Sequence, residues 1–252
     1  MANPEYILGL VLSVFLVIVL VVIVLMTMKR IYNPTQVGTM LIDKPVEMTT
    51  DMTTCSGKLS TSGSEHAYSF WFFVNQWETG SQKKHMFTRT HNSNKIVVEL
   101  DSNHPDMTIR IVDNNNNVVV GSSRSSGTSN DGIFSLKNVR IQGWNHITIC
   151  VWDRLLEVYM NGKLARTFLL PVNLLSNENN GILIGGTSTQ PTFSGFMARF
   201  VYFPRVLSPI EIYNIYLKGP SKTKYLSSEP GTQLGTEIVF GGNNSPECSS
   251  AN

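Results

Sequence analysis

Glu99 and Asp101 are acidic residues whose spacing could support chemistry. Residues i and i+2 of a strand point to the same face, so the two carboxylates would lie side by side. Glycoside hydrolysis needs such a pair, one group as nucleophile and one as acid, at a matched separation. The three residues that follow, Ser102, Asn103 and His104, supply no further carboxylate. We interpret the pair as the polar end of a strand.

The other residue types that commonly carry chemistry have no suggestive spacing. The three cysteines are far apart and form neither a disulfide framework nor a CxxC pair for zinc, and the five histidines lack the spacing of metal ligands. A phosphate-binding loop and a Ser-His-Asp signature are both missing. The sequence thus predicts no catalytic residue, no cofactor-binding residue and no metal ligand. The residues considered are Cys55, Cys150, Cys248, His66, His85, His91, His104 and His146.

Charge and composition exclude several classes of protein. The chain has 252 residues, a net charge of +2 and 15% charged residues, whereas typical soluble domains carry roughly 25%. Nucleic-acid binding needs a clustered basic surface, so nucleic acid is not an expected partner. Aromatic residues make up 10% of the chain, which excludes a disordered protein. The length leaves room for one domain of about 150–200 residues plus extra segments.

An uncharged run extends from Tyr6 to Met28. As a helix it would span roughly 34 Å, enough to cross a hydrocarbon core of about 30 Å. A cleaved signal peptide would instead have a basic start, a shorter apolar core and a small-residue cleavage site. Glu5 precedes the run and Lys29 and Arg30 follow it, so we predict a single-pass transmembrane anchor. The predicted anchor positions are Tyr6, Leu10, Phe15, Leu20, Leu25 and Met28, with Lys29 and Arg30 at the flank.

Lys29 and Arg30 also predict how the chain is oriented. No Lys or Arg precedes the run, so the positive-inside rule places the C-terminal part on the cytosolic side of the membrane. Unpaired thiols suit a reducing compartment. The N-x-S match at Asn243 is followed directly by proline, so heavy glycosylation is not expected.

Composition divides the chain into four segments. Residues 1–32 are the predicted transmembrane anchor. Residues 33–56 are predicted as a linker with one short strand at Gly38–Ile42. Residues 57–219 hold short strands and turns, and residues 220–252 form a tail rich in Ser, Gly and Pro.

Alternation of apolar and polar residues predicts many short strands in the central segment. Ala67–Val74 is apolar on both faces, so we expect it either to be covered on both sides or to end in an interface. Asn161 and Gly162 predict a type I′ hairpin turn, which needs positive φ at both central residues. The turn predicts two cross-strand pairs, Tyr159 with Leu164 and Glu157 with Arg166. The other predicted strands are Lys95–Leu100, Met107–Asp113, Val118–Val120 after a turn at Asn114–Asn117, Gly143–Trp152, Leu155–Met160, Lys163–Leu169, Gly181–Ile184 and Gly195–Phe203.

One helix is predicted to begin after Ser208. Ser208 and Glu211 form a capping box, and Gly219 followed by proline ends the helix. Ile212 should form a hydrophobic staple with Leu207 and pack on the strands. Many short strands and one late helix predict a mainly β, two-sheet antiparallel sandwich.

Three stretches in this order resemble the laminin G-like, concanavalin A-like jelly-roll family. They are Tyr68–Val74, then Gly143–Ile149 with the hairpin Leu156–Leu164, then Ile184–Gly186 continuing to Gly219 and Pro220. The resemblance covers about residues 57–219 and implies a jelly-roll sandwich. Glucanases of this fold place an E-x-D-x-(x)-E pattern on one strand face. Its third carboxylate is missing after Glu99 and Asp101, so we expect no enzymatic activity.

The family resemblance also raises the question of calcium. Laminin G-like domains commonly bind Ca²⁺ through Asp and Asn oxygens. Asp101, Asp113 and Asp131 lie near Asn-rich loops, but their spacing does not form a dedicated calcium loop. Calcium therefore stays an open, unassigned ligand, and solvated turns are the preferred interpretation.

The order of segments suggests two functions of different classes. An anchor, a linker, a sandwich and a polar tail resemble membrane-anchored minor capsid proteins of large icosahedral DNA viruses. That resemblance implies a structural virion protein that links an internal membrane to the capsid shell, with the lipid bilayer and capsid proteins as partners. The alternative is a membrane-displayed, lectin-like module for carbohydrate, in which Trp71, Trp77 or Trp152 stacks on a sugar; for Trp71 we prefer a core position. A cellular adaptor is a third possibility.

Overall fold

The computed structural model describes residues 12–24, 38–48, 53–55, 59, 63–119, 132–175, 181–186, 189–221 and 248–250. The chain divides into two compact units, Met1–Val37 and Gly38–Asn252.

In the N-terminal unit, residues 12–24 are helical and their large apolar side chains, including Phe15 and Leu20, are exposed. Among the residues that the structure describes, no helix is long and apolar enough to cross a membrane. The predicted transmembrane helix is therefore not confirmed. The predicted anchor residues that lie outside the described ranges are Tyr6, Leu10, Leu25, Met28, Lys29 and Arg30.

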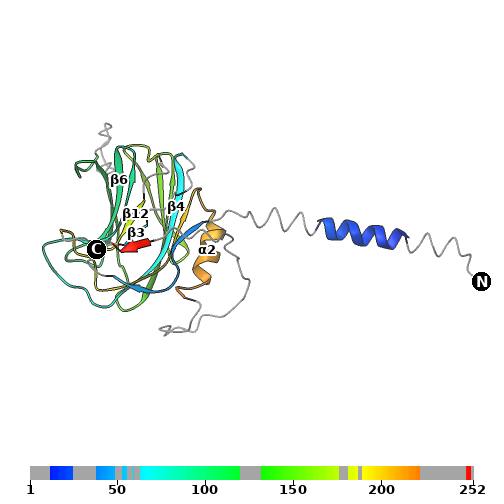
Figure 1. Ribbon diagram of the computed structural model, residues 1–252, viewed down its shortest axis with the longest axis horizontal. Helices are drawn as coiled ribbons and strands as arrows, with labels where there is room; N and C mark the ends of the chain where they lie inside the picture. Colours follow the sequence, from blue (N-terminus) through cyan, green and yellow to red (C-terminus); the bar gives the residue numbers. More distant parts are fainter. Residues whose placement is uncertain are drawn as a thin grey trace, which may run out of the picture. The chain divides into compact units, whose positions relative to one another are not determined.

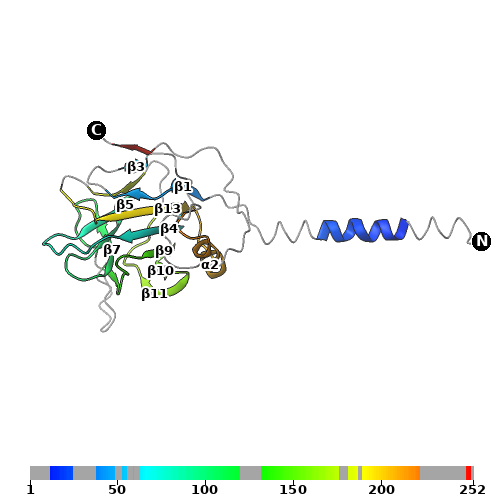
Figure 2. The same ribbon diagram turned by 90° about the horizontal axis from the view of Figure 1, so that it is seen from below.

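The second unit contains two antiparallel sheets, which Figures 1 and 2 show from two directions. Along the described chain, the first sheet, sheet A, has the order β1-β13-β4-β9-β10-β11, and β2 also pairs with β13. The second sheet, sheet B, has the order β14-β3-β12-β5-β6-β7-β8. The strands of sheet A are β1 (Thr39–Ile42), β2 (Val46–Glu47), β4 (Glu65–Val74), β9 (Trp144–Trp152), β10 (Leu155–Met160), β11 (Lys163–Leu169) and β13 (Gly195–Phe203). Those of sheet B are β3 (Thr53–Cys55), β5 (Lys84–His91), β6 (Asn94–Leu100), β7 (Met107–Asp113), β8 (Ile133–Leu136), β12 (Ile182–Ile184) and β14 (Cys248–Ser250).

Strands also form outside the central segment. The short strand predicted at Gly38–Ile42 is confirmed as β1, and the segment predicted as a linker adds β2 and β3. In the segment predicted as a tail, β14 pairs with β3.

The main core lies between the two sheets. Phe70 from β4, Phe87 from β5 and Phe200 from β13 are fully buried, with ring centroids 5.0–5.4 Å apart. These rings join the two layers because β4 and β13 belong to sheet A and β5 belongs to sheet B. The predicted two-sheet sandwich is confirmed.

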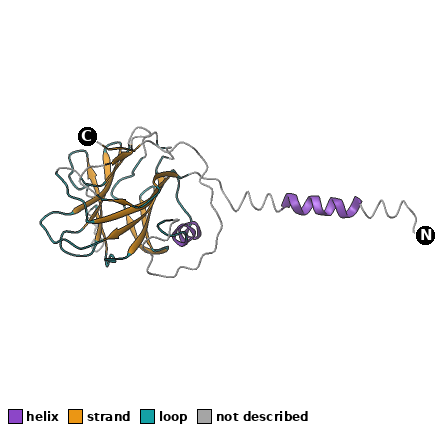
Figure 3. Cartoon of the chain, turned by 60° about the horizontal axis from the view of Figure 1, so that its bottom comes forward, coloured by secondary structure: helices purple, strands orange, loops and turns teal. Residues whose placement is uncertain are grey.

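Helix α2 (Pro209–Leu217) covers part of the outer face of sheet A (Figure 3). The predicted capping box is present, since the Ser208 hydroxyl accepts from the Glu211 backbone and the Glu211 carboxylate accepts from the Ser208 N–H. Ile212 is fully buried in a second cluster with Leu207 and with Ala67 of β4. The prediction that β4 is covered on both faces is therefore confirmed.

The β10–β11 hairpin differs from the prediction in one pair. Tyr159 lies opposite Leu164, as predicted, but Glu157 lies opposite Thr167 and not Arg166. A bulge beside Tyr159 shifts the register. It allows Phe168 of the edge strand to pack on the core, 4.8 Å from Phe134 of sheet B. The packing of Phe168 on the core thus gives the β10–β11 hairpin a different register from the one that the turn alone predicts.

Candidate functional site

A hollow of about 230 Å³ lies on the outer face of sheet B. Its lining residues alternate along the strands with residues of the main core, such as Ile96, Val98 and Ile109, so they point away from that core. The lining residues are Thr88, Lys95, Val97, Arg110, Val112, Asn116, Leu183, Thr189 and Gln190.

The register of four neighbouring strands builds the hollow. Leu183 of β12 lies opposite Thr88 of β5. Thr88 lies opposite Val97 of β6, and Val97 lies opposite Arg110 of β7. These four residues form one row across the sheet, which a single sequence does not reveal. The hollow was not predicted from the sequence. The signal that indicates it is the alternation of outward-facing residues along β6.

The charged residues that line the hollow already form hydrogen bonds within the protein. Arg110 donates to both carboxylate oxygens of Glu99, at 2.6 and 2.8 Å, and Glu99 is only 3% exposed. Lys95 donates to the Asn114 carbonyl and to the Asn116 side-chain oxygen, at 3.3 and 3.2 Å. The charges on this face are therefore balanced or solvated, and the hollow combines a polar rim with apolar side chains such as Val97.

His85 lies beside the hollow, opposite Glu99 and in contact with Thr88. Its side chain is buried, and its two ring nitrogens contact the Gly185 carbonyl and the Thr88 hydroxyl. A carbonyl only accepts, so Nδ1 carries the proton and Nε2 accepts from the Thr88 hydroxyl. Burial lowers the pKa of His85, which keeps the ring neutral. The Thr88 oxygen is then left as a hydrogen-bond acceptor toward the hollow.

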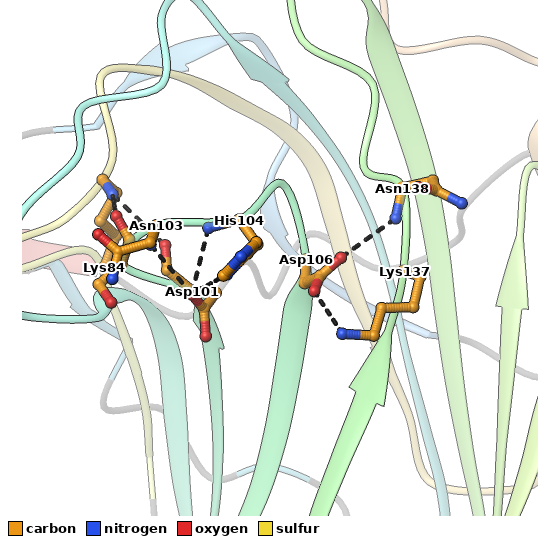
Figure 4. Close-up of polar contacts among 8 residues, drawn as sticks. Lys84, Asp101, Asn103, His104, Asp106, Lys137 and Asn138 are labelled. Atoms are coloured by element: carbon orange, nitrogen blue, oxygen red, sulfur yellow. Dashed lines mark hydrogen bonds and ion pairs between the residues drawn. The ribbon is translucent and has the colours of Figure 1, made fainter.

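The structure places Glu99 and Asp101 in different settings. Glu99 is bonded by Arg110 on the sheet, whereas Asp101 lies in the β6–β7 loop and accepts the backbone N–H groups of Asn103 and His104 (Figure 4). The backbone N–H of Asn103 makes the largest contribution to lowering the pKa of Asp101. Each carboxylate thus has its own partners, and the arrangement is that of a strand end and a capped turn.

The acidic residues considered for calcium also have protein partners. Asp113 caps a turn by accepting from Asn115 and Asn117. Asp106, which was not among the residues predicted for calcium, binds Lys137 at 2.6 Å (Figure 4). Within the described ranges, no group of three or more His, Cys, Asp or Glu side chains could hold a metal ion. Asp131 lies outside those ranges.

The three tryptophans considered for sugar stacking lie away from the hollow. Trp71 is buried under α2 and stacks on Tyr216 with ring centroids 5.6 Å apart, so the preferred core position is confirmed. The Trp77 ring is partly buried, with the Lys84 ammonium 5.0 Å from its centroid. Trp152 is 56% exposed at the end of β9, in sheet A.

Comparison with known proteins identifies the family. A sequence profile described as the concanavalin A-like lectin/glucanases superfamily, of the laminin G type, matches residues 48–213. The chain belongs to this family. The resemblance stated from the sequence motifs is thereby confirmed for the fold family.

Solved structures show the same fold at low sequence identity. The receptor-binding domain of botulinum neurotoxin mosaic serotype C/D matches with a TM-score of 0.50 and 13% identity, over 73% of this chain and 51% of that one. The receptor-binding domain of botulinum neurotoxin D also gives a TM-score of 0.50 at 13% identity, over 69% of this chain and 43% of that one. The chain thus spans about half the length of these relatives or less. No curated protein sequence matches significantly.

Proposed function

We propose that the chain is a non-enzymatic interaction protein that its N-terminal apolar segment holds at a membrane. The observation that carries the proposal is the hollow on sheet B, whose charged side chains are already bonded by protein groups. Glu99 is tied to Arg110 and Asp101 to its own turn, so the pair is not arranged as nucleophile and acid. Such a face can bind a partner through shape complementarity and hydrogen bonds, and it does not need to carry out a reaction.

Membrane attachment rests on the uncharged run from Tyr6 to Met28. Residues 12–24 of this run are helical, and the full run as a helix would span a hydrocarbon core. Lys29 and Arg30 favour the cytosolic side for the family domain. Digestion of sealed membranes with a protease tests this orientation, because a cytosolic domain is cleaved and a lumenal domain is protected.

For the biological setting, we propose a minor capsid protein that links an internal virion membrane to the capsid shell. This role is supported by the sequence resemblance of the segment order to membrane-anchored capsid proteins and by a family domain suited to contact. Mass spectrometry of purified particles should find the chain in stoichiometric amounts. Its absence from the particles would contradict the capsid role while leaving a cellular interaction role.

Photo-crosslinking from the hollow tests the interaction directly. Asn116 lines the hollow and is exposed, so a photoreactive amino acid there should capture the partner in intact particles or membranes. Asn103 is also exposed but lies in the β6–β7 loop, and it serves as the matched control position. Crosslinks to another structural protein from position 116 and not from 103 support the proposal. Equal crosslinking from both positions, or none, would refute it.

Carbohydrate is the second candidate ligand, and the composition of the hollow favours it. The lining side chains combine hydroxyl and amide groups, as in Thr88 and Gln190, with apolar Val97 and Leu183. A pocket that fixes a ligand by a few polar groups over apolar contacts is typical of small-molecule sites. Specific binding of residues 38–252 on a glycan array, lost in Thr88→Val, would favour this candidate over a protein partner.

A further inference from the structure

Helix α2 is apolar on its outer side as well as on the side that packs on sheet A. Ile210 is 70% exposed, Tyr213 is 44% exposed and Leu217 is 60% exposed. These positions are spaced i, i+3 and i+7, so they form one stripe along the helix. Ile212, on the other side, is fully buried. The stripe therefore makes no contribution to the core of the domain.

The β10–β11 hairpin extends this stripe. A side-chain carbon at Gly162 would lie 2.9 Å from the Tyr213 ring, so the turn lies directly against the helix. Leu164, two residues after Gly162, is 54% exposed. We call the four residues Ile210, Tyr213, Leu217 and Leu164 the α2 face.

Exposed basic residues lie beside Leu164 of the α2 face, whereas the nearby Glu157 accepts the Tyr159 hydroxyl. Lys163 and Arg166 are exposed on either side of Leu164 in β11. The acidic residue of the helix, Glu211, is bonded through both oxygens to Arg205, at 2.6 and 3.0 Å. That hydrogen bonding lowers the pKa of Glu211 to about 2 and keeps the pair neutral overall.

We propose that the α2 face docks on an anionic lipid surface. Apolar side chains with an interfacial tyrosine and flanking basic residues have the composition of surfaces that lie on membranes. The inference rests in part on the proposed membrane attachment, which brings a bilayer within reach. Ten residues lie between Met28 and Thr39, and the eleven residue-to-residue steps from one to the other extend at most about 40 Å. Thr39 of β1 pairs with Tyr202 of β13, the strand that leads into α2.

Vesicle flotation of residues 38–252 tests the proposal without the N-terminal segment. This unit contains every residue of both buried clusters, so we expect it to fold by itself. We expect it to float with vesicles of phosphatidylcholine and phosphatidylserine and to bind vesicles of phosphatidylcholine alone at least several-fold more weakly. High salt should weaken the binding, because the charge attraction is screened. No flotation with either vesicle would overturn the proposal.

Matched variants locate the contact. We expect two variants to lower the vesicle partition coefficient roughly tenfold or more, because each removes apolar side chains that would insert into the lipid. They are Leu164→Ser and the double variant Ile210→Gln/Leu217→Gln. Leu169→Ser is the control, because Leu169 lies on the same strand with 52% exposure but outside the α2 face. Thermal melting should show that all variants stay folded. Equal loss in the control, or variants that change self-association and not vesicle binding, would refute lipid as the occupant.

Failure of the α2 docking surface and failure of the N-terminal anchor give different experimental results. If residues 38–252 float and the full chain is nevertheless released from membranes by alkaline carbonate, the lipid-docking surface stands and the N-terminal anchor fails. If the full chain resists carbonate and residues 38–252 do not float, the anchor stands and the docking surface fails.

Discussion

Acid should unfold the family domain because it buries neutral histidines. Burial lowers the pKa of His146 to about 3 from its ordinary value of 6.5. Burial, together with the nearby Arg89 charge, lowers the pKa of His91 to about 3 as well. His146 is buried against Trp71 and bonds to the Ser69 hydroxyl at 3.0 Å, so the ring has little room for a hydrated charge.

The size of the effect follows from proton linkage. Between pH 6.5 and pH 3 the unfolded chain binds a proton at each of these histidines and the folded chain does not, so stability falls as the pH falls. At about pH 5 the loss is roughly 2 kcal/mol for each histidine, or about 4 kcal/mol for both. Domains are stable by about 5–15 kcal/mol, so this loss is a large share of the total.

Urea unfolding of residues 38–252 at a series of pH values measures this loss. His146→Phe keeps a ring beside Trp71 and removes one titrating group, so the drop in unfolding free energy between pH 7 and pH 5 should shrink by about 2 kcal/mol. His104→Gln is the control, because 76% of the His104 side chain is exposed, and it should leave the slope unchanged. A His146→Phe slope equal to that of the parent would refute the claim that the buried ring is held neutral.

Four further predictions follow from local geometry. Gly162→Ala should cost about 1–2 kcal/mol in urea unfolding, because Gly162 has a φ of +78° and faces Tyr213. Ser208→Ala should cost about 1 kcal/mol by the same assay, through loss of the helix cap. Arg110→Ala should cost about 3 kcal/mol, because it leaves the buried Glu99 carboxylate unpaired. Burial raises the pKa of Cys150 to about 12, so mass-spectrometric mapping should find this thiol slow to alkylate at neutral pH until the domain unfolds. A stability unchanged within error, or rapid alkylation, would contradict the corresponding prediction.

Features encoded by neighbouring residues were predictable from the sequence. Ser208 and Glu211 are three positions apart, and they form the expected cap because its hydrogen bonds need no distant partner. Asn161 and Gly162 have φ values of +50° and +78°, as the hairpin turn requires. The period of two in β4 was likewise sufficient to predict that both of its faces are covered.

Features that depend on distant segments were not predictable. The pairing of Arg166 was wrong because a bulge lets Phe168 reach the core, and the turn alone contains no information about that contact. The hollow needs Thr88, Val97 and Arg110 in one row, which depends on the pairing of three strands.

Alkaline carbonate extraction of membranes that contain the full chain, beside residues 38–252 expressed alone, tests the central claim most directly. A chain held by the Tyr6–Met28 run should stay in the membrane pellet, while residues 38–252, with at most a surface contact, should be released. Release of the full chain into the supernatant would contradict membrane attachment and, with it, the proposed role as a membrane-held interaction protein.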